Sequence, residues 1–257
     1  MAGKVKGQAV VMKIEALADE IYSLWIKEEK IAEEAKAGQF LSFFSKDGSK
    51  LLPRPISICE INKVQGLLRV VFRVVGFGTE ELSKVHTGDT VEVMGPLGNG
   101  FILEGSKAIL IGGGIGIPPM LELAKSLSIQ KSIVLGYRTD DLFLKEEFEP
   151  YGTVYVSTED GTAGTKGNVI DAIKENAIDA DIIFACGPTP MLKGIKAYAM
   201  EHSIMAQLSL EEKMACGIGA CLACVCKSKE KDHHTNVNNK RICKDGPVFY
   251  AEEIDAF

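Results

Sequence analysis

The sequence predicts a β barrel followed by an α/β domain, with a small cysteine-rich region at the C-terminus. Short strand patterns rich in Val, Ile and Phe fill about the first hundred residues. Strand and helix patterns then alternate along the middle of the chain. Five of the seven cysteines fall between Cys216 and Cys243. We therefore expect three domains, at residues 1–101, 102–208 and 209–257.

The composition is that of a soluble globular protein. The chain has 257 residues, of which 46% are hydrophobic and 25% charged, enough for two compact cores. The net charge of −6 and the lack of a basic stripe argue against a nucleic-acid partner. The longest uncharged stretch, residues 108–121, is too short to cross a bilayer, and the N-terminus lacks the apolar core of a secretion signal. We expect a cytoplasmic protein that does not enter a membrane.

The first domain is predicted to be a six-stranded antiparallel barrel. Gly or Asp residues separate its short apolar runs, and six such runs in about a hundred residues are typical of a small barrel. The expected strands are residues 8–17, 21–26, 39–44, 56–61, 67–75 and 90–94.

The second domain is predicted to be a parallel sheet with helices on both faces, because strand and helix patterns alternate in it. The expected strands are residues 108–111, 132–135, 153–156, 181–185 and 205–208. The expected helices are residues 118–127, 142–148, 169–175 and 190–202, the first of which begins with a favourable Pro.

Four cysteines of the C-terminal region have the spacing of a plant-type 2Fe–2S site. Cys216, Cys221 and Cys224 form C-x4-C-x2-C, and Cys243 follows after a longer interval. The small residues between them let the backbone wrap closely and aim amide groups at sulfur, which helps to set the reduction potential. The region is expected to be held together by its metal rather than by a core.

Three other readings of this region stay open. Zinc also binds four thiolates, although zinc ribbons usually show two C-x2-C pairs. Cys226 could replace Cys224, at the cost of the spacing. His233 and His234 could form a Rieske-like pair, but they lie in a polar, charged stretch that favours solvation.

Two motifs in the barrel domain suggest a flavin and its phosphates. In Arg54-Pro-Ile-Ser57 the Arg and the Ser can both face a flavin, and Arg suits bidentate phosphate contact. Gly76-Phe-Gly78-Thr79 follows a strand and offers amides and a hydroxyl to a pyrophosphate. Each motif alone is also found in ordinary turns, so their order and spacing together carry the interpretation.

Two motifs in the α/β domain indicate a nucleotide. Gly112, Gly113, Gly114 and Gly116 follow a strand and open a helix, where a phosphate can approach the backbone closely. Cys186-Gly187-Pro188 ends another strand, at the edge where open parallel sheets bind ligands, so Cys186 is expected beside a nicotinamide ring. The alternatives are a tight turn and a buried structural thiol.

The order of these motifs, with Gly95-Pro-Leu-Gly-Asn-Gly-Phe101 between them, resembles the ferredoxin–NADP reductase superfamily. With the C-terminal cysteines, the chain resembles the family of electron-transfer subunits of dihydroorotate dehydrogenase B, most specifically over residues 209–221. The resemblance implies an oxidoreductase subunit that carries FAD, NAD(H) and a 2Fe–2S cluster. It makes Cys216, Cys221, Cys224 and Cys243 the cluster ligands. The residues that it places at FAD are Arg54, Pro55, Ile56, Ser57, Val71, Phe72, Arg73, Gly78 and Thr79.

The resemblance also implies the partner and the reaction. Electrons would pass between NAD(H), FAD, the cluster and the FMN of a dihydroorotate dehydrogenase catalytic subunit, as part of pyrimidine (UMP) biosynthesis, in a heterotetramer of two copies of each subunit. Asp140 and Asp141 would repel a 2′-phosphate, whereas Arg138 would attract one. We expect the two carboxylates to prevail and the nucleotide to be NAD rather than NADP. The alternatives are the flavin and iron–sulfur subunit of an NADH-dependent ferredoxin–NADP oxidoreductase (sulfide dehydrogenase) and, in another class, a zinc-stabilised interaction module without turnover.

Overall fold

The structure is a computed structural model that describes residues 4–231 and 236–255. The chain divides into two compact units. The barrel unit comprises Met1–Gly100, Glu211–Val225 and Arg241–Pro247, and the sheet unit comprises Phe101–Leu210, Cys226–Lys240 and Val248–Phe257. The region after residue 210 therefore contributes segments to both units, while the division into three domains stays a prediction.

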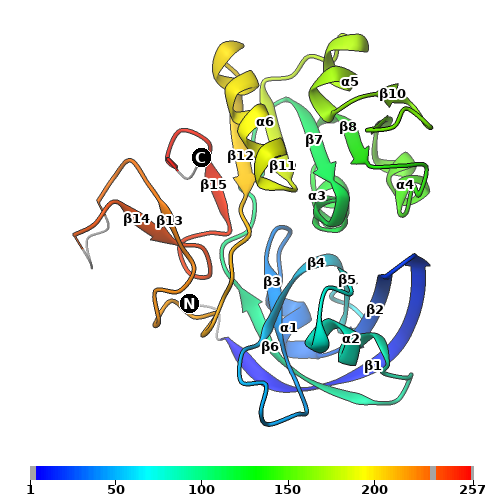
Figure 1. Ribbon diagram of the computed structural model, residues 1–257, viewed down its shortest axis with the longest axis vertical. Helices are drawn as coiled ribbons and strands as arrows, with labels where there is room; N and C mark the ends of the chain where they lie inside the picture. The colour runs from blue at the N-terminus through cyan, green and yellow to red at the C-terminus, as the bar shows by residue number, and fades with distance from the viewer. Residues whose placement is uncertain (1–3, 232–235, 256–257) are drawn as a thin grey trace. The chain divides into compact units, whose positions relative to one another are not determined.

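The barrel unit contains the predicted closed antiparallel barrel (Figure 1). Its strands follow the order β1-β2-β5-β4-β3-β6 around the barrel. Alternate side chains fill the interior, among them Leu24, Leu41, Ile58 and Val70, none of which is exposed. The strands are β1 (Val5–Ala18), β2 (Ile21–Lys27), β3 (Phe40–Phe44), β4 (Arg54–Asn62), β5 (Leu67–Arg73) and β6 (Thr90–Leu97).

Two short helices complete the barrel domain, α1 (Glu29–Glu34) and α2 (Phe77–Ser83). Helix α1 was not predicted, because its cap is the carboxylate of Glu28, which accepts from the Ile31 amide at 2.5 Å, rather than a preferred Ser, Thr, Asp or Asn. Strand β4 begins two residues earlier than predicted, which brings Arg54 and Pro55 into the barrel wall.

The sheet unit contains the predicted parallel sheet, in the order β10-β9-β8-β7-β11-β12-β15 (Figure 1). Strand β15 runs antiparallel to β12 at the edge, which the sequence did not indicate. The strands are β7 (Lys107–Gly113), β8 (Gln130–Tyr137), β9 (Thr153–Thr158), β10 (Thr165–Lys166), β11 (Ile182–Cys186), β12 (Met205–Ser209) and β15 (Val248–Tyr250). The helices are α3 (Pro118–Ser126), α4 (Lys145–Phe148), α5 (Val169–Glu175) and α6 (Thr189–Glu201), with 3-10 turns at Gly114–Gly116 and Glu149–Tyr151.

The C-terminal region also contains a two-stranded sheet. Its strands are β13 (Val225–Lys227) and β14 (Asn239–Arg241). Strand β15 is held to the rest of the sheet unit by side chains as well as by backbone. The Tyr250 hydroxyl donates to Glu104 Oε1 at 2.5 Å, and Gln207 Nε2 donates to the same oxygen at 2.9 Å. Across residues 4–231 and 236–255, every helix is too short or too polar to cross a membrane.

Candidate functional site

The four cysteines of the predicted cluster site lie in the barrel unit, on two segments that meet. The Ile242 amide donates to the Cys224 carbonyl at 2.9 Å and so brings the two segments together. The four thiols interact with one another: Cys216 with Cys221, and Cys243 with both Cys224 and Cys216. Cys224 and Cys243 are buried, whereas Cys221 is exposed.

Backbone amides point at two of these sulfur atoms. Ile218 and Ala220 donate to Cys216 Sγ at 3.4 and 3.3 Å, and the Cys243 amide donates to Cys224 Sγ at 3.4 Å. Burial disfavours the Cys216 thiolate, but the backbone amides of residues 218, 220 and 221 and the Cys221 side chain outweigh it and lower the pKa of Cys216 to about 6. Burial and the neighbouring Cys224 thiol raise the pKa of Cys243 to about 12. The Cys216 thiol is therefore already disposed to lose its proton to a metal.

This donor set fits a dinuclear cluster. Four thiols on two adjoining segments offer the four ligands that such a cluster needs, and amide donors to sulfur are the surroundings that such clusters use. Cys226 is buried and lies in the sheet unit, whereas the four predicted ligands lie in the barrel unit. His233 and His234 lie outside the described residues.

Polar contacts that the sequence reading missed hold the Cys243 turn. Asn99 donates its side-chain amide to the carbonyls of Lys244 and Asp245 at 3.2 and 3.0 Å. Arg241 pairs with Asp245 at 3.1 Å and also donates to the Gly219 carbonyl at 3.3 Å, which ties the two cysteine segments to each other. Asn99 belongs to the Gly95–Phe101 motif, which could have marked it.

The structure brings together two of the predicted flavin residues that are distant in sequence. The guanidinium of Arg54 lies directly over Gly78, where any side chain would collide with it. Gly78 is in the first turn of α2, and the Thr79 hydroxyl caps that turn by accepting from the Val75 amide at 3.0 Å. Arg54 is therefore placed beside the start of α2, as a phosphate-binding arrangement would require.

The other predicted flavin residues lie on β4 and β5 with different orientations. Pro55 is exposed, and Ser57 and Arg73 are partly exposed. Ile56 and Phe72 point into the barrel core, and Val71 is buried, so these three are suited to backbone rather than side-chain contact with a ligand.

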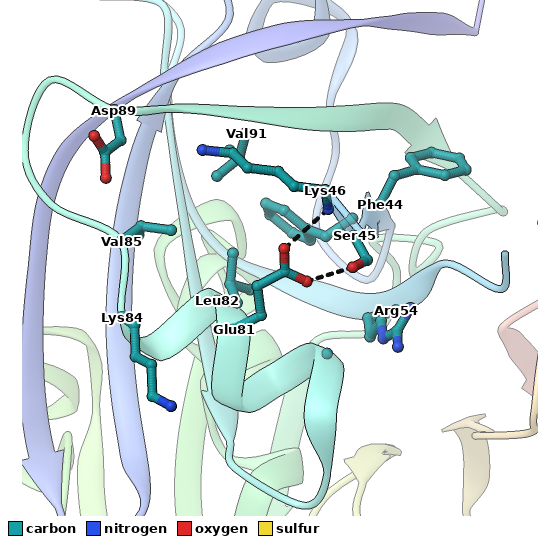
Figure 2. A pocket seen from close by; sticks show the side chains of 12 residues that line it. Phe44, Ser45, Lys46, Arg54, Glu81, Leu82, Lys84, Val85, Asp89 and Val91 are labelled. Carbon is teal, nitrogen blue, oxygen red and sulfur yellow. Dashed lines mark hydrogen bonds between the residues drawn. The ribbon is translucent and has the colours of Figure 1, made fainter. Parts of the chain in front are cut away.

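A pocket of about 160 Å³ adjoins Arg54 and Gly78 (Figure 2). Its wall is ordered by Glu81 of α2, whose carboxylate accepts from the Ser45 hydroxyl at 2.5 Å and from the Lys46 amide at 2.9 Å. Lys46 and Lys84 also line it, so the lining has three cations, with Arg54, against the two carboxylates of Glu81 and Asp89.

The two nucleotide motifs meet in the sheet unit. Gly112 of β7 pairs in register with Cys186 of β11. A Cβ atom at Gly116 would collide with the Cys186 carbonyl and lie 2.6 Å from Gly187 Cα, so only glycine lets the two turns pack.

Gly113 has the same role toward a different neighbour, since a Cβ atom there would collide with the sulfur of Met191 and lie 3.4 Å from Pro188 Cδ. Gly114 has a φ of +53°. The Cys186 thiol is fully buried. Arg138, Asp140 and Asp141 follow β8 and are all exposed.

Two family models match this chain. Residues 211–255 match the iron–sulfur cluster binding domain of dihydroorotate dehydrogenase B, and residues 110–197 match an oxidoreductase NAD-binding domain.

Curated relatives match over nearly their full length. The electron transfer subunit of dihydroorotate dehydrogenase B (NAD(+)) from Caldanaerobacter subterraneus is 42% identical, with 97% of this chain and 98% of that protein covered. The subunit of the same name from Bacillus velezensis is 41% identical with the same coverage.

Solved structures show the same fold. A structure described as an NADH-dependent reduced ferredoxin-NADP oxidoreductase that carries out flavin-based electron bifurcation superimposes with a TM-score of 0.87 and 34% identity, covering 100% of this chain and 92% of that one. A ferredoxin NADP+ reductase from Neisseria gonorrhoeae shares the fold at a TM-score of 0.64 and 16% identity, covering 76% and 91%.

The barrel, the parallel sheet and the cysteine-rich tail define an electron-transferring oxidoreductase with a ferredoxin-reductase-like fold. At 42% identity over nearly the whole length, the chain belongs to the family of electron transfer subunits of dihydroorotate dehydrogenase B. The predicted function and enzyme class are thereby confirmed, and the matched domains and fold support the predicted NAD(H), iron–sulfur and flavin cofactors. A subunit of this kind has a catalytic partner subunit, as its family name states.

Proposed function

We propose that this chain transfers electrons between NADH and the FMN of a dihydroorotate dehydrogenase catalytic subunit, through FAD and a 2Fe–2S cluster, in pyrimidine biosynthesis in the cytoplasm. The assembly would contain two copies of each subunit. The observation that carries the proposal is the four thiols on two hydrogen-bonded segments, with backbone amides directed at Cys216 and Cys224. When bound, FAD and the cluster together convert the two-electron chemistry of NADH into one-electron steps.

The residues of the barrel unit divide this work. Cys216 and Cys221 would hold one iron, and Cys224 and Cys243 the other. Arg54 would hold a phosphate of FAD over Gly78, while the backbone of β4 and β5 lines the flavin. The fixed contacts of Asn99 and Arg241 would keep the cysteine segments in position and limit the rearrangement that electron transfer requires.

The residues of the sheet unit would bind the nucleotide. The turn at Gly112–Gly116 opens helix α3, and a phosphate would approach it at Gly114, where an added Cβ atom would meet nothing within 4 Å. Cys186, Gly187 and Pro188 would lie at the nicotinamide, with no acid–base or covalent role for the Cys186 thiol. The orotate site would lie in the partner subunit.

The test is Cys221→Ser in the full chain, assembled with its catalytic partner. NADH should still reduce the FAD, whereas orotate-dependent NADH oxidation should fall by at least about a hundredfold, about 2.7 kcal/mol in barrier terms, because one iron loses a thiolate. Cys226→Ser is the matched control, since Cys226 lies in the sheet unit and is not among the four predicted ligands. Equal effects of the two substitutions, or unchanged orotate-linked oxidation in the Cys221 variant, would contradict the proposed ligand set.

A second candidate function is the flavin and iron–sulfur subunit of an NADH-dependent ferredoxin–NADP oxidoreductase, favoured by the 34% identity to a structure of that description. Co-purification separates the two. A pyrimidine-oxidising FMN protein as the partner supports our proposal, and an NADP-reducing partner supports the alternative. Iron and sulfide counts exclude the zinc-stabilised module, which would be colourless.

A further inference from the structure

Ser42 of β3 carries a buried hydroxyl that the proposed function does not use. Its neighbours Leu41 and Phe43 point into the barrel core, so Ser42 points to the outer face of the barrel wall. The residue is 0% exposed. Within the described part of the chain, its Oγ atom has no hydrogen-bond partner.

The cysteine-rich loop covers this hydroxyl. Gly217, directly after Cys216, has a φ of +68° and packs so closely that a Cβ atom on it would lie 3.2 Å from Ser42 Oγ. The same Cβ atom would lie 3.3 Å from Leu97 Cδ1 and 3.5 Å from Met94 Cε. Ser42 Oγ therefore faces the backbone that carries Cys216, within otherwise apolar surroundings.

A buried hydroxyl without a partner costs about 1–3 kcal/mol, so this site calls for an acceptor. No described residue supplies one, the Cys216 sulfur included. A cluster held by Cys216 would bring sulfide next to the loop that contains Gly217, and a negatively charged sulfide is an acceptor of the right kind.

We propose that the Ser42 hydroxyl donates a hydrogen bond to a sulfide of the 2Fe–2S cluster and raises the reduction potential of the cluster. The inference rests on the proposed cluster ligands. A donor to sulfur stabilises the more negative, reduced state, which gives the direction of the effect. Ser42 is thus a positioning residue on a strand that pairs with β4, where its register partner is Pro55 of the flavin motif.

The test is Ser42→Ala in the holoprotein, prepared anaerobically. We expect full iron and sulfide content and a shift of the cluster's midpoint potential to more negative values. The potential is measured from the paramagnetic signal of the reduced cluster during a dithionite titration. We also expect the loss of an exchangeable proton coupled to the reduced cluster, measured by pulsed magnetic resonance in H2O and D2O. The apoprotein should be no less stable than the wild type, because the substitution removes an unsatisfied hydroxyl.

Ser157→Ala is the matched control. Ser157 of β9 is the second buried serine whose hydroxyl lacks a partner among the described residues, and it lies in the sheet unit. It should leave the cluster potential and the proton coupling unchanged. The inference is overturned if Ser42→Ala keeps both the wild-type cluster potential and the proton coupling. It is also overturned if the substitution shifts only the flavin potential. Wild-type protein that binds no iron would instead overturn the proposed function.

Discussion

The contact between Arg54 and Gly78 shows how a single missing side chain positions a charged group. The guanidinium occupies the space where a Cβ atom of residue 78 would be, so Gly78→Ala must displace it. The displaced group is the end of a flexible side chain, and the fold should therefore survive. We expect FAD to bind about tenfold more weakly, a loss of about 1.4 kcal/mol, measured by fluorescence titration of the apoprotein.

Gly7→Ala is the control for this substitution, because a Cβ atom at Gly7 of β1 would meet nothing within 4 Å. It should bind FAD as the wild type does. If Gly78→Ala also retains full affinity, Arg54 does not hold a phosphate of FAD.

Which individual residues could be predicted from the sequence depended on how local their chemistry is. The predicted cysteine ligands and the glycine-rich turn can be recognised because their spacing lies within one short segment. Ser42, Asn99 and Arg241 were missed because each acts on residues brought near by folding. Ser42 meets Gly217 and Asn99 meets Lys244 across more than a hundred residues, and a lone Ser or Asn has no pattern that announces such a contact.

Strand β15 attaches the end of the chain to the sheet unit, and the Tyr250–Glu104 bond tests how it does so. The bond to Glu104, with burial and the carboxylate charge, raises the pKa of Tyr250 from 10.0 to about 12. A folded-state pKa above the unfolded value means that the stabilisation is complete below pH 10 and is lost as the pH rises from about 10 to about 12. Tyr250→Phe should lower the free energy of unfolding by roughly 1 kcal/mol at pH 8, and the difference from wild type should shrink above pH 10.

Denaturant unfolding of the sheet unit, followed within the full chain, measures this difference. Tyr155→Phe on β9 of the same sheet is a control for the loss of one tyrosine hydroxyl. A Tyr250→Phe difference that stays constant between pH 8 and pH 11 would show that the hydrogen bond does not stabilise the attachment of β15.

The elements themselves were predicted well where a periodic pattern was long. Helix α5 has the predicted bounds, β7 and β8 extend by one or two residues at each end beyond the predicted runs, and β11 is shifted by one residue toward the C-terminus. Helix α1 and strand β15 were missed for physical reasons. The former has an unusual Glu cap and only six residues, and the latter has three residues whose strand conformation depends on pairing with β12.

The molecule as a whole separates its tasks between two compact units, with the glycine-rich turn and Cys186 in one and the cysteine pairs in the other. This division predicts that a substitution in the glycine-rich turn impairs the reaction with NADH but leaves the bound FAD and the cluster intact. Gly116→Ala places a Cβ atom against the backbone of Cys186 and Gly187, which cannot move aside as a flexible side chain could. We expect kcat/KM for NADH to fall about a hundredfold, about 2.7 kcal/mol, with FAD and iron content as in the wild type.

Dithionite distinguishes this result from general misfolding, since it should reduce the flavin and the cluster of Gly116→Ala to the wild-type extent without passing through the nucleotide site. Gly194→Ala on α6 is the matched control in the same unit, because its Cβ atom would meet only the end of the Ile170 side chain, at 3.1 Å. NADH should reduce that control at the wild-type rate. If Gly116→Ala also keeps the wild-type rate with NADH, nucleotide binding does not depend on the close packing of the two turns. If Gly116→Ala loses FAD or iron, the two units do not hold their cofactors independently.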